Sequence, residues 1–158
     1  MNKFTILKNP TDLDEESKEL MEKAKEALQY AYAPYSNFQV ATAILLHDGT
    51  VVTGTNQENA AYPSGMCAER VALFTVASQH PGKKIKKLVV LARLASQSGL
   101  APATSCGPCR QVMLEFEQRQ HQPFEVIMQN QQYAWVKAPS AESLLPFCFS
   151  NESLQVRK

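Results

Sequence analysis

Three segments decide the fold of this chain: CAERVALFTVA at residues 67–77, KLVVLA at residues 87–92 and CGPCRQVMLEF at residues 106–116. The first is predicted to form a buried helix, and the third a helix that runs from Gly107 to about Gln118. The second is a short apolar run next to polar residues, which is typical of a buried strand. Helices that alternate with strands indicate an α/β fold in which helices cover a mixed sheet.

The residues before this region predict a helix followed by a β-hairpin. Apolar residues recur at helical spacing from residue 12 to 32, and Pro34 ends the helix. Alternating apolar residues predict a strand at 38–46. Asp48-Gly49 is a strong hairpin turn, so a second strand is predicted at 51–54.

The residues after this region predict two strands, at 124–128 and 133–136, and a short helix at 141–145. The connection between the two strands is too short for a parallel crossover, so they are predicted to be antiparallel. Loops are predicted at 56–66 and 93–105, and a polar tail after Phe149. The predicted order is α-β-β-α-β-α-β-β-α. Neither a repeat nor a linker is evident, so residues 1–158 are predicted to form one domain.

Composition excludes several classes of protein. Hydrophobic residues make up 44% and charged residues 20% of the chain, as in ordinary globular proteins. A net charge of +1 argues against a nucleic-acid partner. The one basic cluster, Lys83, Lys84, Lys86 and Lys87, is interpreted as a solvated approach to a strand.

No signal peptide is predicted in Met1 to Pro10, and no apolar run reaches the roughly 20 residues that a membrane span needs. A cytoplasmic location is therefore expected. The four cysteines should stay reduced there, which favours metal binding or catalysis over disulfides.

The strongest chemical feature is the set of Cys67, Cys106 and Cys109. The C-x-x-C spacing lets the sulfur atoms of Cys106 and Cys109 meet one ion at a helix start. Three thiolates leave the fourth position on a zinc ion open, which distinguishes a catalytic site from a closed structural one. The sequence therefore predicts one catalytic Zn²⁺ per chain.

Glu69 follows Cys67 by two residues and is predicted to be the catalytic acid and base. A carboxylate there can take a proton from an activated water and pass it to a substrate. An upstream Cys-x-Glu with a C-x-x-C pair is the pattern of zinc-dependent deaminases, in which the glutamate does not bind the metal.

The C-x-x-C pair has two other interpretations: a structural zinc site and a redox pair. A closed zinc site would need Cys148, His47, His80 or His121 as a fourth ligand, and none has motif spacing. A redox pair would leave Cys67-Ala68-Glu69 unexplained. Cys148 lies in an apolar segment and is predicted to be a buried structural thiol.

At this point the chain resembles the homotetrameric zinc-dependent cytidine deaminases, from about residue 20 to 149. The segments that carry the resemblance are YAPYSNFQV at 32–40, NQENAAY at 56–62, CAER at 67–70, CGPCRQ at 106–111 and LLP at 144–146. The resemblance implies a three-layer αβα sandwich with a mixed five-stranded sheet. It also implies a homotetramer with sites near subunit interfaces, in the cytoplasm, with a small-molecule pyrimidine nucleoside as its ligand and neither nucleic acid nor membrane as a partner.

The resemblance implies hydrolytic deamination of cytidine and deoxycytidine to uridine and deoxyuridine, a reaction of pyrimidine salvage. By its motifs, Asn56 and Glu58 would bind the ribose 3′-hydroxyl and Phe38 would pack on the pyrimidine ring. The backbone N–H of Ala68 would donate to the 2-oxo group, and Arg70 would offset the negative charge of the thiolates.

This sequence departs from the usual family pattern at several positions. These are Thr55, Ser105 in place of Pro, Pro108, Phe147, Cys148 and a longer loop near residues 94–103. They put substrate detail in doubt more than the type of reaction. Two alternatives therefore stay open: a deaminase of another aminopyrimidine nucleoside, such as a blasticidin-like antibiotic, and a catalytically silent zinc-binding relative. A polynucleotide deaminase is disfavoured because such enzymes usually have His as the first ligand.

Overall fold

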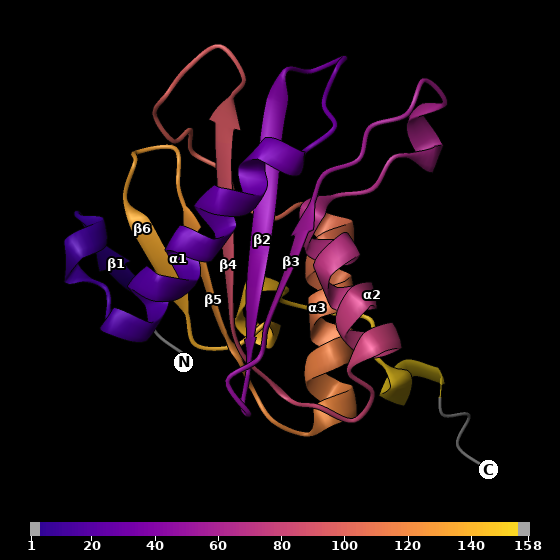
Figure 1. Ribbon diagram of the computed structural model, residues 1–158. Coiled ribbons are helices and arrows are strands. Elements are labelled where there is room, and N and C mark those ends of the chain that lie inside the picture. Colours follow the sequence, from indigo (N-terminus) through magenta and orange to yellow (C-terminus); the bar gives the residue numbers. More distant parts are fainter. Residues whose placement is uncertain (1–3, 155–158) are drawn as a thin grey trace.

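A computed structural model describes residues 4–154 of the chain. One mixed sheet has the strand order β1-β6-β5-β4-β2-β3, and only β4 and β5 are parallel neighbours. The strands are β1 (Thr5–Leu7), β2 (Phe38–Leu46), β3 (Val51–Thr55), β4 (Ile85–Leu94), β5 (Glu125–Gln129) and β6 (Trp135–Ala138). The α-helices are α1 (Glu15–Ala27), α2 (Ala68–Gln79) and α3 (Gly107–Gln120). Helix α1 covers one face of the sheet, and α2 and α3 pack side by side on the other (Figure 1).

The sheet is buried on both faces because alternate residues of its central strands enter two different cores. In β4, Leu88 and Val90 join the core beneath α2 and α3, whereas Val89 and Leu91 join the core beneath α1. Successive side chains of a strand point to opposite faces, so a continuous apolar run suits a strand that is covered on both sides. This arrangement confirms the predicted sandwich of helix, sheet and helix.

The sheet has six strands, not the five that were predicted. The additional strand β1 has three residues, Thr5–Leu7, which pair antiparallel with Trp135 to Lys137 of β6. Three residues are too few to show the alternating pattern that predicts a strand. The hydrogen bonds of β1 come instead from a partner about 130 residues away along the chain.

The element types agree with those predicted, but several boundaries differ. Helix α1 begins after Asp14, whose carboxylate accepts a hydrogen bond from the N–H of Ser17, and it gives way to a 3₁₀ turn at Leu28–Tyr30. Strand β4 extends to Leu94, into the predicted loop. The predicted short helix near residue 141 is a 3₁₀ turn at Glu142–Leu144.

Two predictions about buried and exposed residues were wrong. Cys148 is only half-buried, and its neighbours Phe147 and Phe149 are exposed, so the end of the apolar segment lies at the surface although Leu144 is buried. The tail forms a 3₁₀ turn at Asn151–Leu154, and its last four residues lie outside the described range.

Within residues 4–154, no helix has the length and apolar character that crossing a membrane demands.

Lys87 was predicted to be solvated, but it is 4% exposed. Its Nζ atom lies 2.9 Å from Asp14, 3.2 Å from Glu16 and 3.3 Å from Glu125, and it also donates to the hydroxyl of Ser17. Burial by itself would lower the pKa of Lys87, but the hydrogen bonds to these carboxylates raise it above its usual value. A buried lysine is tolerated when it is paired in this way.

The direction of the strands explains why the cysteines meet. Strands β3 and β4 both run antiparallel to β2, which lies between them, so their carboxyl ends are at the same edge of the sheet. Helix α2 follows β3, and α3 follows β4 after a loop. That loop is tied back to the sheet, because the N–H of Ala103 donates to the carbonyl of Gln129 at 3.0 Å. Both helices therefore begin at this edge.

Gly54 allows α2 to lie against β3. A Cβ atom at this position would be 2.4 Å from the backbone N of Ala72 and 2.7 Å from the carbonyl oxygen of Ala68. These atoms belong to the helix backbone and cannot turn away as a flexible side chain would. Gly54 thus sets the distance between strand and helix near the first cysteine.

We expect Gly54→Ala to lower the free energy of unfolding by about 1–3 kcal/mol or more, because overpacking a core forces the backbone to shift. Urea denaturation of the zinc-loaded protein measures this change. Gly99→Ala is the matched control, since no heavy atom lies within 4 Å of a Cβ built there. Equal stability of the two variants would show that the close approach at Gly54 is not needed.

Candidate metal centre

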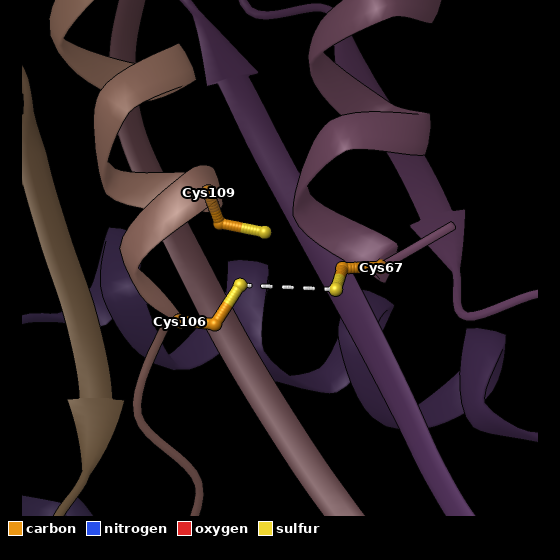
Figure 2. A group of neighbouring side chains, drawn as sticks. All are labelled: Cys67, Cys106 and Cys109. Atoms are coloured by element: carbon orange, nitrogen blue, oxygen red, sulfur yellow. Dashed lines mark hydrogen bonds between the residues drawn. The ribbon is translucent and has the colours of Figure 1, made fainter. Parts of the chain in front are cut away.

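Three cysteine sulfur atoms converge where α2 and α3 begin. Cys67 is the N-cap of α2, Cys106 is the N-cap of α3, and Cys109 lies in the first turn of α3. Their three Sγ atoms all lie within 4.8 Å of one another, and those of Cys67 and Cys106 are 3.9 Å apart. Figure 2 shows the three sulfur atoms pointing toward one another between the two helices. Within the described part of the chain, no histidine, carboxylate or further cysteine joins this group, which contradicts a closed four-ligand site.

The donor set fits zinc. Ligands about 2.3 Å from a tetrahedral zinc ion lie about 3.8 Å from one another, close to the separation between the sulfur atoms of Cys67 and Cys106. All three cysteines are free thiols. A hydrogen bond from Cys109 is the main cause that lowers the pKa of Cys67 to about 5, whereas the same contact raises the pKa of Cys109. Metal binding deprotonates such ligands and releases their protons.

Positive charge surrounds the sulfur atoms. The N-termini of α2 and α3 both face them, and helix N-termini carry partial positive charge. Nη2 of Arg70 donates to Sγ of Cys67 at 3.7 Å, and this contact raises the pKa of Arg70. Three thiolates around Zn²⁺ would carry a net charge of −1, so a cation at this position suits a thiolate-rich site.

Glu69 is buried beside the three sulfur atoms, with only 4% of its surface exposed. Burial raises the pKa of its carboxyl group, and negative charge on Cys67 raises it further. The backbone of the first turn of α2 holds Glu69 next to Ala68, which is fully buried. A carboxyl group with a raised pKa can hold a proton near neutral pH and give it up to a reacting group.

These groups face a cavity of about 620 Å³. Every predicted site residue except Cys109 lines this cavity: Phe38, Asn56, Glu58, Cys67, Ala68, Glu69, Arg70 and Cys106. Cys109 is fully buried just behind it. The fold therefore brings together segments from β2, from the loop after β3 and from the starts of α2 and α3. Ligands of open α/β sheets commonly bind at this position, outside the carboxyl ends of the strands.

Asn56 and Glu58 are held by hydrogen bonds within the protein. Oδ1 of Asn56 accepts from the N–H of Val40 at 2.8 Å, and Nδ2 donates to the carbonyl of Phe38 at 2.9 Å. Glu58 accepts from the N–H groups of Tyr35 and Ser36 and from the hydroxyl of Ser36. The hydrogen bond from the Ser36 hydroxyl is the main cause that lowers the pKa of Glu58.

Several cavity residues were missed by the sequence analysis, although some stand in the motifs that it used. They are Tyr35, Ser36, Val40, Gln57, Asn59, Tyr62, Gly65, Met66, Val90, Ala103 and Thr104. Ser36 stands in the YAPYSNFQV motif, and its place in that motif was the one signal that could have marked it. Thr104 carries no motif signal and lines the cavity because it precedes Ser105 and Cys106.

Residues 14–122 match the family model described as the cytidine and deoxycytidylate deaminase zinc-binding region. The chain belongs to the cytidine and deoxycytidylate deaminase family. Membership in this family identifies the Cys67, Cys106 and Cys109 group as a zinc-binding triad.

Individual cytidine deaminases are similar along most of their length. The chain is 36% identical to the cytidine deaminase of Sporosarcina psychrophila over 135 residues, which are 85% of this chain and 92% of that protein. The crystal structure of cytidine deaminase from Burkholderia pseudomallei matches with a TM-score of 0.68 and 38% identity, covering 87% of this chain and 100% of that one. The crystal structure of the enzyme from Mycobacterium tuberculosis matches with a TM-score of 0.66 and 31% identity, covering 87% and 99%.

We expect Cys109→Ser to weaken zinc binding at least about 100-fold, because losing a residue that merely supports a ligand already costs about 10–100-fold. Competition with a chromogenic chelator measures the affinity. Cys148→Ser is the matched control, since Cys148 is a free thiol outside the triad. If both variants held zinc as tightly as the parent protein, Cys109 would not be a ligand.

Proposed function

We propose that this chain hydrolytically deaminates cytidine and deoxycytidine, forming uridine and deoxyuridine with release of ammonia. The observation that carries the proposal is the buried carboxyl group of Glu69, which adjoins the three-thiol site in a cavity large enough for a nucleoside. Pockets for small molecules commonly have volumes of about 300–1,000 Å³. Family membership and the cytidine deaminases matched above support the same reaction.

The triad would hold one zinc ion, and the chemistry that the ion supplies when bound is the activation of water, whose pKa it lowers to about 7. Glu69 is the proposed proton carrier. It would receive the two protons of the attacking water in turn, deliver the first to N3 of the cytosine ring, and pass the second to the 4-amino group as ammonia leaves and the water oxygen becomes the 4-oxo group. Arg70 offsets the negative charge of the thiolates throughout.

The rest of the cavity would hold the pyrimidine ring. The first four N–H groups of a helix have no partner within the helix, so the N–H of Ala68 is available to donate to the 2-oxo group. Phe38 is half-buried at the start of β2 and lines the same cavity, where its ring can pack on the base. These two contacts would hold the base with its N3 atom near Glu69.

Asn56 and Glu58 suit a ribose hydroxyl, which is both a donor and an acceptor. A carboxylate accepts about four hydrogen bonds, and three sites on Glu58 are taken by Tyr35 and Ser36. Of the two N–H bonds of the Asn56 amide, one is taken by the carbonyl of Phe38. The pair therefore has one acceptor site and one donor left for the 3′-hydroxyl. A site built in this way rejects ligands without the hydroxyl, because its polar groups would then be left unpaired.

The test is the loss of absorbance when zinc-loaded protein is mixed with cytidine, deoxycytidine or free cytosine. We expect turnover of both nucleosides, little turnover of cytosine, and a loss of about 10²–10⁴-fold in kcat for Glu69→Gln with zinc retained. Glu115→Gln, an exposed residue on α3, is the control and should leave kcat unchanged. Full turnover by Glu69→Gln would remove Glu69 from its proposed role. Zinc-loaded protein that converts neither nucleoside would contradict the proposed substrate.

We also infer that the chain forms a homotetramer in the cytoplasm. Its free thiols suit a reducing compartment. Tyr35 and Tyr62 are exposed beside the cavity, and exposed aromatic residues are enriched where protein surfaces meet. Sedimentation equilibrium should give four times the mass of one chain, and a monomer at micromolar concentration would contradict this inference.

A further inference from the structure

One exposed serine that lines the cavity has no role in the proposed mechanism. Ser36 lies in the loop before β2, and Glu58, which lines the same cavity, is its partner. The Oγ atom of Ser36 donates to Oε1 of Glu58 and accepts a hydrogen bond from the N–H of Phe38 at 3.0 Å. One hydroxyl group therefore joins the carboxylate that is proposed to bind the ribose to the first residue of β2.

The backbone around Ser36 is fixed by bonds that its own side chain does not make. Asn37 has a left-handed conformation with a φ of 55°, which asparagine tolerates better than most residues. Its N–H donates to the carbonyl of Ala33 at 3.0 Å, and its carbonyl accepts from the N–H of Ala95 at 2.8 Å. The loop is thus closed on itself and anchored just beyond the end of β4, which gives Ser36 a defined position.

The N–H of Phe38 determines the direction in which the Ser36 hydroxyl donates. A hydroxyl group has one hydrogen to donate and two lone pairs that accept. An N–H group can only donate, so it occupies a lone pair of Oγ and leaves the hydrogen for Glu58. The hydroxyl is therefore a fixed donor to a carboxylate, and hydrogen bonds to an ionised acceptor are about twice as strong as those between neutral groups.

The two oxygen atoms of Glu58 are held in different ways. Oε2 accepts from the N–H of Tyr35 at 2.9 Å and from the N–H of Ser36 at 3.2 Å, which fills both of its acceptor sites. Among the described residues, the Ser36 hydroxyl is the one donor to Oε1. The acceptor site that Glu58 has left is therefore on Oε1, the oxygen atom that the Ser36 side chain holds.

We propose that Ser36 is a positioning residue whose hydroxyl fixes Oε1 of Glu58 so that the remaining acceptor site of this oxygen atom receives the 3′-hydroxyl of a nucleoside. The inference rests on the proposed function, because a 3′-hydroxyl reaches Glu58 only when a nucleoside is the ligand. The two N–H groups that hold Oε2 belong to the backbone. Removing the Ser36 hydroxyl therefore leaves Oε2 bound and releases Oε1 alone, which weakens the contact with the ribose while the carboxylate stays.

Deoxycytidine and 2′,3′-dideoxycytidine are the matched substrates for the kinetic test, because they differ only in the 3′-hydroxyl. We expect Ser36→Ala to raise KM for deoxycytidine about tenfold, the low end for a hydrogen bond to a charged group, because Ser36 is exposed. The value of kcat should not change, since the ribose contact is the same in the bound substrate and in the transition state. For dideoxycytidine, which cannot use the positioned oxygen atom, KM should change less than about twofold. Equal losses for the two substrates would indicate a merely structural role and would overturn the proposal.

Two further variants test whether the hydroxyl itself is responsible. Ser36→Thr retains the hydroxyl and should restore most of the affinity for deoxycytidine. Ser78→Ala is the matched control, because Ser78 is an exposed serine of α2 whose hydroxyl donates to the carbonyl of Thr75 and does not line the cavity. This variant should leave KM for both substrates unchanged.

Calorimetric titration with the corresponding products, deoxyuridine and 2′,3′-dideoxyuridine, measures binding without turnover. Ser36→Ala should weaken the binding of deoxyuridine about tenfold and that of dideoxyuridine less than about twofold. If the zinc-loaded parent binds these ligands but converts neither cytidine nor deoxycytidine, the proposed function is overturned, and the difference between the two ligands still decides the inference. If the parent is active and Ser36→Ala binds both ligands as tightly as the parent does, only the inference is overturned. A parent protein that binds no nucleoside overturns both.

Discussion

The close approach of α2 to the sheet is the constraint on which the site depends. Because Gly54 has no side chain, the first turns of α2 rest directly on β3, and the N-terminus of α2 lies at the carboxyl edge of the sheet. Strand β4 runs in the same direction as β3 and delivers α3 to the same edge. Three sulfur atoms from segments 39 residues apart therefore meet between two helix N-termini. Side chains on helices and strands are positioned more precisely than side chains on loops, so the placement of the three sulfur atoms depends on the rigid elements around them.

Elements with a strong periodic pattern could be predicted from the sequence alone. Strand β2 was placed correctly from residue 38 to 46 because its alternating side chains enter two cores. The features that could not be predicted depend on partners far away along the chain. Strand β1 exists through its pairing with β6, and Lys87 is buried because Asp14, 73 residues earlier, lies beside it. No local window of sequence contains that information.

The candidate site likewise has some residues that a local sequence pattern identifies and others whose placement depends on partners far away along the chain. The cysteine spacing by itself identified the three sulfur ligands, since few chemistries need that pattern. The hydrogen bonds that hold Glu58 were not predicted, because Ser36 reaches it across 22 residues of chain from a different loop. Ser105 could be recognised only as a departure from the family pattern. That its hydroxyl is buried, with no hydrogen-bond partner within residues 4–154, is a property of packing, which depends on Arg110 and on the loop that precedes it.

Charge balance explains why a carboxyl group can work beside thiolates. Burial and the negative charge on Cys67 both raise the pKa of Glu69 and favour its protonated form, whereas the hydrogen bond from its own backbone N–H favours the ionised form. Arg70 and the two helix N-termini reduce the negative charge of the sulfur atoms. A proton carrier is most effective when its two protonation states are close in free energy at the working pH. The opposing influences on Glu69 bring the free energies of its two protonation states closer together. The groups around the triad therefore affect proton transfer as well as metal binding.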